Sequence, residues 1–131
     1  MIRINEVKEM ATILVVEDDK HTQLLTEARL KKHFKVLSCN NGKEALDLVY
    51  KTTIDLIVSD VMMPEMDGYE STTEIRKISA FKHLPILAVT AKAMMGDREK
   101  CIAAGASDYI SKPVDVDQLI SLLRVWLYDK N

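Results

Sequence analysis

The chain contains three near-continuous apolar runs that predict strands buried on both faces. These runs are rich in Val and Ile and cover Thr12–Glu17, Ile54–Asp60 and Pro85–Thr90. Such runs are typical of the interior of a parallel sheet, whose two faces are both covered by helices. Weaker runs at Lys35–Cys39 and Asp108–Ser111 predict two further strands, which we place at the edges of the sheet.

Segments with helical periodicity lie between the predicted strands. We expect five helices, at residues 20–33, 42–51, 69–79, 95–104 and from Asp115 onward. The expected apolar faces consist of Leu24, Leu25 and Ala28; Ala45, Leu48 and Val49; Ile75 and Ile78; and Leu119, Leu122, Leu123 and Trp126. The last of these faces follows the i, i+3, i+4, i+7 spacing of an amphipathic helix most clearly.

Local end signals support these helices. Capping-box spacing occurs at two helix starts, at Asn41 with Glu44 and at Asp115 with Gln118. Gly105 stands where the fourth helix needs a C-cap. Strands that alternate with helices indicate one doubly wound α/β domain with right-handed crossovers. We assign this domain to residues 12–129 and treat residues 1–11 as an N-terminal extension.

The composition fits a single globular domain. The 131 residues are 47% hydrophobic and 29% charged, which is enough apolar material for a core at this length. Lys and Arg number 18 against 20 Asp and Glu, for a net charge of −2, and no run of five like charges occurs. We therefore do not expect binding to nucleic acid, which needs a basic surface.

The apolar runs are also too short for a membrane span. None exceeds four residues, whereas a spanning helix needs about twenty, and the charged N-terminal stretch lacks the apolar core of a signal peptide. We expect no membrane association and a cytoplasmic location. The cysteines and histidines lack metal-site spacing, so we expect structural or surface roles for Cys39, Cys101, His21, His33 and His83.

Several polar side chains directly follow the predicted strands. They are Glu17, Asp18 and Asp19 after the first strand, Asp60 after the third, Thr90 after the fourth and Lys112 after the fifth. Ligands of open parallel sheets bind beyond the carboxyl ends of the strands, so we expect these groups to converge. Singly, each has an ordinary structural explanation, since an aspartate at a strand end often caps the next helix. Together they indicate a functional site.

Clustered carboxylates persist only when they are protonated, paired or metal-bound. At 4 Å and an effective dielectric constant near 20, a like-charge pair costs about 4 kcal/mol. Carboxylate oxygens with space for water and a phosphate suit Mg²⁺ better than zinc or copper. A carboxylate can also attack phosphorus and form an aspartyl phosphate, whose oxygens Mg²⁺, Lys and Thr groups can hold.

The segments VVEDD, SDVMMPEMDG, VTAKA and AGASDYISKP, in this order and spacing, resemble the receiver domains of bacterial two-component response regulators. The resemblance covers about Ala11 to Asp129, and residues 90–127 are most similar to receivers of hybrid sensor histidine kinases. It implies a flavodoxin-like five-stranded parallel sheet of order 2-1-3-4-5 with five helices. It also implies a protein that is not an enzyme and catalyses only its own phosphorylation and dephosphorylation.

By this resemblance, Asp60 is the phosphoacceptor and takes the phosphoryl group from a histidine kinase or a histidine phosphotransfer protein. Mg²⁺ would be bound by Asp18 and Asp60, by the backbone carbonyl of Met62, and through water by Glu17. Family members often have aspartate at the position of Glu17. The longer side chain is therefore a departure that affects the metal geometry.

The resemblance also assigns a switch. Lys112 and Thr90 would contact the phosphoryl group, and Tyr109 would turn inward into the space that Thr90 vacates, although an ordinary packed ring is the alternative. The face formed by the fourth helix, the fifth strand and the fifth helix would then be repacked for an output protein.

Met62 and Lys92 would flank the site and set the lifetime of the phosphoryl group. The apolar side chain of Met62 would hinder the attacking water. The alternative for Met62 is a partly buried side chain that only fills space.

Other functions on this architecture lack their motifs. No glycine-rich phosphate-binding loop follows the first strand. The Asp-x-His-x-x-Gly motif of cobalamin-binding domains is incomplete, because Leu24 stands where it requires glycine. A dehalogenase-type phosphatase requires a second aspartate two positions after the nucleophile, where this chain has Met62. A pseudo-receiver, which binds proteins without being phosphorylated, remains as the alternative. The sequence is equally consistent with a free-standing receiver and a piece of a hybrid kinase, either monomeric or weakly dimeric.

Overall fold

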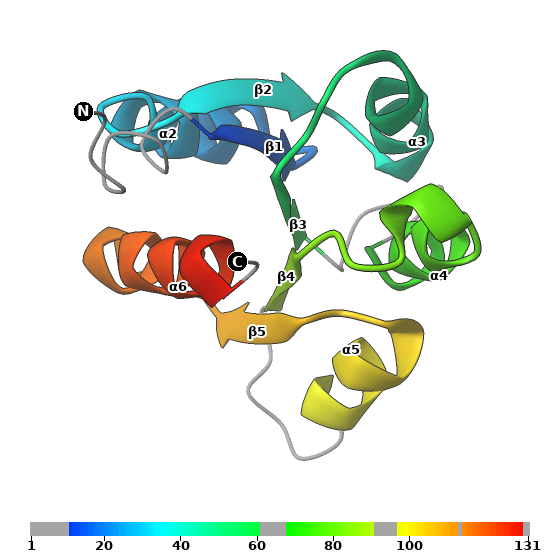
Figure 1. The fold of residues 1–131 in the computed structure, drawn as a ribbon. Helices are drawn as coiled ribbons and strands as arrows, with labels where there is room; N and C mark the ends of the chain where they lie inside the picture. The colour runs from blue at the N-terminus through cyan, green and yellow to red at the C-terminus, as the bar shows by residue number, and fades with distance from the viewer. Residues whose placement is uncertain (1–10, 61–67, 91–96, 113, 130–131) are drawn as a thin grey trace.

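A five-stranded parallel sheet runs through the molecule (Figure 1). The computed structural model describes residues 11–60, 68–90, 97–112 and 114–129. In sheet order, the strands are β2 (Lys35–Cys39), β1 (Thr12–Val16), β3 (Leu56–Asp60), β4 (Ile86–Thr90) and β5 (Asp108–Ser111). The five predicted strands and their 2-1-3-4-5 order are confirmed, and the two weaker runs form the edges.

Helices cover both faces of this sheet. In the described part of the chain they are α2 (Lys20–Leu30), α3 (Gly42–Lys51), α4 (Gly68–Arg76), α5 (Asp97–Ala104) and α6 (Val116–Asp129), with a short 3-10 helix η1 (Ser79–Phe81) before β4. Figure 1 shows α2 and α6 on one face and α3, α4 and α5 on the other, which confirms the doubly wound, flavodoxin-like arrangement. None of the described helices is long and apolar enough to cross a membrane.

Each face of the sheet has its own apolar core. Ile13 and Val15 of β1 belong to the core on the side of α2 and α6, whereas Leu14 and Val16 belong to the core on the side of α3 and α4. Successive strand residues point to opposite faces, so every position of a doubly covered strand is buried. This explains why the central strands are continuous apolar runs.

The strand register brings the carboxyl ends of the strands level with one another. The pairs nearest these ends are Val16 with Cys39, Val16 with Ser59, Asp60 with Val89, and Thr90 with Ser111. All pairs are parallel, so residues that follow the strands meet at one edge of the sheet. This edge carries the candidate chemistry.

The apolar face predicted for α2 is wrong. Leu24 and Leu25 are 57% and 50% exposed, and Ala28 is also exposed. The residues that α2 buries are Gln23 and Leu30. A polar residue can replace an apolar one here because the Gln23 amide donates hydrogen bonds to backbone carbonyls at the ends of β1 and β2.

The other predicted helix faces agree better with the structure. The residues that α3 and α6 bury or half-bury include Ala45, Leu48, Val49, Leu119, Leu122, Leu123 and Trp126, as predicted. The helices α2 and α4 end three residues earlier than predicted, at Leu30 and Arg76. Ile75 is buried in α4, but Ile78 lies between α4 and η1.

Three predicted helix ends are present. Asn41 caps α3, since the Glu44 N–H donates to its side chain (3.0 Å), while the Glu44 carboxylate accepts from the N–H of Asn40 (2.7 Å). Asp115 accepts from two backbone N–H groups at the start of α6 (2.9 and 3.2 Å). Gly105 ends α5 with a φ of 107°, which a residue with a Cβ rarely adopts.

Candidate functional site

Three carboxylates meet at the carboxyl edge of the sheet. Glu17 and Asp18 follow β1, Asp60 ends β3, and one oxygen from each lies within 4.8 Å of the other two. Glu17 and Asp60 are only 6% and 4% exposed, whereas Asp18 is exposed. Consecutive side chains of a strand point to opposite faces. The side chains of Glu17 and Asp18 are consecutive, yet both approach Asp60. The backbone is therefore no longer extended after Val16.

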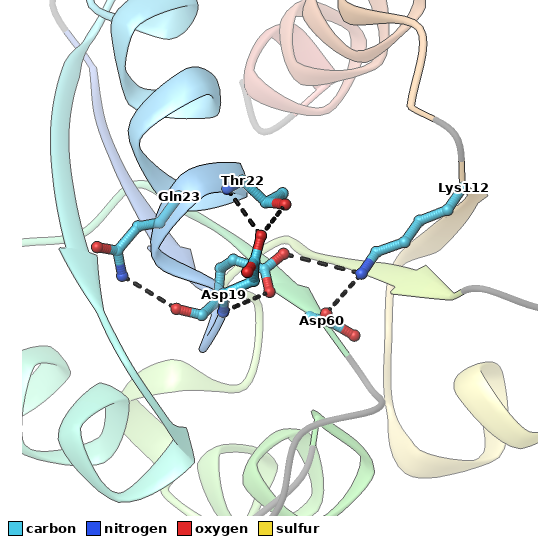
Figure 2. A network of polar contacts seen from close by, with 6 residues as sticks. Asp19, Thr22, Gln23, Asp60 and Lys112 are labelled. Carbon is cyan, nitrogen blue, oxygen red and sulfur yellow. Dashed lines mark hydrogen bonds and ion pairs between the residues drawn. The ribbon is translucent and has the colours of Figure 1, made fainter.

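Lys112 supplies a cation to this cluster. Its Nζ donates to Oδ2 of Asp60 at 2.7 Å (Figure 2). The same Nζ lies 3.8 Å from Oε1 of Glu17. The backbone N–H of Lys112 donates to the carbonyl of Thr90 at 2.7 Å. This bond extends the pairing of β4 with β5 by one residue and fixes where the lysine leaves the sheet.

The close charges shift the pKa values at the site. Burial raises the pKa of Glu17 from 4.5 to about 7, and the charge of Asp60 adds to this, whereas the Asp19 N–H and Lys112 lower it. Burial lowers the pKa of Lys112, but its hydrogen bond to Asp60 and the charges of Asp60, Glu17 and Asp18 outweigh burial and raise it overall. The lysine is therefore charged at neutral pH.

The donor set fits a hard divalent cation. The three clustered groups of Glu17, Asp18 and Asp60 offer only oxygen ligands, which Mg²⁺ and Ca²⁺ prefer. Among the described residues, the ammonium of Lys112 contacts two of these three carboxylates, those of Asp60 and Glu17. A bound cation would compensate the remaining negative charge.

Asp19 caps α2 and does not join the cluster. Its Oδ2 accepts from the backbone N–H of Thr22 at 2.9 Å and from the hydroxyl of the same residue (Figure 2). The hydroxyl bond, followed by the N–H bond, lowers the pKa of Asp19. The structural explanation for a strand-end aspartate therefore holds for Asp19, whereas Asp18 lies with the other two acids.

The structure places the predicted switch residues on adjacent strands. Thr90 is fully buried at the end of β4, the strand next to β3. Tyr109 is half-buried in β5, where it pairs with Ala88 and packs against the small cluster that includes this alanine. The proposed rate-tuning residues Met62 and Lys92 lie outside the described residues.

A groove of about 820 Å³ leads to the site between α2 and α6. Its apolar lining includes Leu25 of α2 and Leu119 of α6, and its lining also includes Asp60 and Lys112. Asp60 is thus accessible from this side although little of its surface is exposed.

Gln23 is a buried residue near the site that the sequence pattern did not single out. It is 3% exposed, and its Nε2 donates to the carbonyl oxygens of Glu17 and Cys39, both at 3.0 Å. A lone glutamine in a helical segment belongs to no motif. Its contacts depend on how closely the ends of β1 and β2 approach, which only the fold shows.

The fold and these residues define a protein class. A family model of the response regulator receiver domain matches residues 13–124. The chain therefore belongs to the receiver domains of two-component response regulators, as its motifs indicate. This is a family of signalling domains and not in itself a family of enzymes.

Known relatives include both short regulators and large kinases. The chain is 34% identical over 119 residues to the polar-differentiation response regulator DivK of Brucella anthropi, which covers 90% of this chain and 97% of DivK. It is 35% identical over 120 residues to the histidine-protein kinase BarA of Shigella flexneri, covering 91% of this chain and 13% of BarA. The chain spans about half the length of two other curated relatives that it matches, 50% of one and 56% of the other.

A solved structure shows the same arrangement. The receiver domain of the sensor histidine kinase PA1611 from Pseudomonas aeruginosa matches with a TM-score of 0.83 and 36% identity. The match covers 90% of this chain and 98% of that domain, which carries a magnesium ion in its active site cleft.

Proposed function

We propose that this chain is an active receiver, which accepts a phosphoryl group on Asp60 from a histidine kinase or a histidine phosphotransfer protein. The position of Asp60 carries the proposal. It is a buried carboxylate at the carboxyl edge of the sheet, bonded at 2.7 Å to Lys112 and clustered with Glu17 and Asp18. Histidine kinases among the relatives support this class of donor.

The proposed transfer uses the carboxylate as a nucleophile. A lone pair of an Asp60 oxygen forms a P–O bond while the P–N bond of the phosphohistidine breaks, and the imidazole keeps that electron pair and takes up a proton. The ammonium of Lys112 and the hydroxyl of Thr90 donate to the phosphoryl oxygens. Water later hydrolyses the acyl phosphate and restores the carboxylate of Asp60.

The residues of the cluster would hold Mg²⁺. Asp18, Asp60 and the backbone carbonyl of Met62 are the proposed direct ligands, and Glu17 would bind through water. When bound, Mg²⁺ neutralises negative charge on the phosphoryl oxygens. The magnesium ion in the related PA1611 receiver supports the same ion for this chain.

The signal would leave the site through Thr90 and Tyr109. Thr90 would move to meet the phosphoryl group, and the ring of Tyr109 would fill the space. This would repack the face of α5, β5 and α6 for an output protein. We propose that this signalling takes place in the cytoplasm and that the protein is a monomer or a weak dimer. The competing function is that of a pseudo-receiver, which binds proteins without being phosphorylated.

Intact-mass spectrometry tests the proposal. The protein is incubated with acetyl phosphate, with and without Mg²⁺, beside Asp60→Ala. We expect a Mg²⁺-dependent gain of one phosphoryl group in the wild type and none in the variant. A pseudo-receiver gives no gain in either protein, and in that case the search turns to binding partners.

A further inference from the structure

We propose that Gln23 is a positioning residue for the acidic loop at residues 17–19. Its buried carboxamide orients the peptide between Glu17 and Asp18 so that both carboxylates approach Asp60. The inference rests on the proposed function, because it concerns the residues that would hold Mg²⁺. It adds a residue that neither binds the metal nor touches the phosphoryl group.

The carboxamide of Gln23 lies where β1 and β2 end. Its Nε2 donates to the backbone carbonyls of Glu17 and Cys39, both at 3.0 Å, and is 3.3 Å from Oδ1 of Asn40. Its Oε1 accepts from Nζ of Lys20 at 3.2 Å. Figure 2 shows the Gln23 amide directed at the backbone oxygen beside the acidic cluster. Both ends of this buried amide therefore have partners.

The contact with Glu17 matters because the strand geometry changes at this residue. The N–H of Glu17 still donates to the carbonyl of Cys39 at 3.1 Å, which continues the pairing of β1 with β2. Its carbonyl instead accepts from the side chain of Gln23. This carbonyl belongs to the peptide that leads into Asp18, so the hydrogen bond from Gln23 fixes the plane of that peptide.

The far end of the loop is also fixed to α2. The N–H of Gln23 donates to the carbonyl of Asp19 at 2.9 Å, and the Asp19 side chain caps the helix. One residue of α2 thus holds both ends of a three-residue loop, by its side chain at Glu17 and by its backbone at Asp19. Because Glu17 and Asp19 are both held in this way, the position of Asp18 between them is restricted as well.

The test separates metal affinity from stability. Gln23→Met keeps the length and helix propensity of the side chain but removes the donor, so the Glu17 carbonyl loses its partner. We expect the Kd for Mg²⁺, measured by isothermal titration calorimetry on the unphosphorylated protein, to rise about ten-fold, the usual effect of losing an outer partner of a metal ligand. The matched control is Leu30→Val, a core substitution in the last turn of the same helix, which should lower the melting temperature and leave the Kd near wild type.

Each outcome is decisive. A weaker Kd in Gln23→Met alone supports the proposal, whereas a wild-type Kd, or equal weakening in Leu30→Val, overturns it. If Gln23→Met does not fold, Gln23→Leu, which also lacks a donor and carries no charge, should weaken binding similarly; unchanged binding there overturns the proposal. Absence of Mg²⁺ binding by the wild type overturns both this inference and the metal part of the proposed function, whereas failure of Gln23 alone leaves Asp60 phosphorylation intact.

Discussion

Nζ of Lys112 lies 2.7 Å from Oδ2 of Asp60, although 52 positions separate the two residues. The contact joins the ends of β5 and β3, which are separated in the sheet by β4. Glu17 lies 3.8 Å from the same ammonium. One lysine therefore balances two buried carboxylates, and the charge of the site depends on it.

Loss of this lysine should destabilise the protein through Asp60. We expect Lys112→Met to cost about 1–2 kcal/mol of unfolding free energy, less than a fully buried pair would lose, because the lysine side chain is 34% exposed. In an Asp60→Asn background the cost should shrink, since a neutral amide needs no cation. Urea unfolding of the four proteins measures this coupling, and equal costs in both backgrounds contradict it.

The pKa of Glu17 predicts an unusual dependence of stability on pH. Folding raises this pKa from 4.5 to about 7, so between these values the folded state binds more protons than the unfolded state. Below about pH 4.5, Glu17 is protonated in both states and does not affect the free energy of unfolding. As the pH rises, ionisation of Glu17 lowers this free energy, and above about pH 7 the loss is complete, at most about 3 kcal/mol.

Glu17→Gln isolates this effect from other titrating groups. The neutral amide cannot ionise, so the variant should gain stability relative to wild type between pH 5 and pH 8 when Mg²⁺ is absent. Thermal unfolding across this range gives the difference. A constant difference between the two proteins is incompatible with the raised pKa.

Gly105 should resist substitution for two reasons. Its φ of 107° strains any residue with a Cβ, and an added Cβ would lie 2.6 Å from Cγ of Arg76. We expect Gly105→Ala to lose about 1–3 kcal/mol of unfolding free energy. In an Arg76→Ala background only the backbone strain should remain, so the loss should be smaller; an undiminished loss shows that the arginine side chain does not contribute.

Much of this fold could be predicted because the relevant signals are local. Val- and Ile-rich runs indicate buried strands, and glycine or Asn/Asp caps mark helix ends. The face of α2 could not be predicted in this way. Periodicity counts apolar residues, whereas the residue that α2 buries in its first turn is Gln23, whose amide is satisfied by carbonyls 6 and 16 positions away.

The site shows the same division. Convergence of Asp60 and Lys112 follows from parallel strands whose carboxyl ends meet at one edge. The sequence does not tell which strand-end aspartate caps α2 and which joins the acidic cluster. The backbone conformation at Asp19 decides this, because it directs the side chain of Asp19 to the start of the helix. Arg76 is a long-range case, since its guanidinium donates to the carbonyls of Gly105 (2.8 Å) and Phe81 (3.0 Å), contacts that no sequence motif indicates.

The lifetime of the phosphoryl group should depend on Met62. An apolar side chain two positions after Asp60 is expected to hinder the attacking water, so Met62→Asn should speed autodephosphorylation. The rate is measured by intact mass after the donor is removed from phosphorylated protein. An unchanged rate would leave Met62 as filler.

The identity of the phosphorylated residue tests the central claim most directly. Borohydride reduces an acyl phosphate of aspartate to the alcohol, which converts the residue to homoserine. The protein is treated with acetyl phosphate and Mg²⁺, reduced, digested and sequenced by tandem mass spectrometry. We predict homoserine at position 60; homoserine at Asp18 or Asp19, or at no position, would contradict the assignment of Asp60 as the phosphoacceptor.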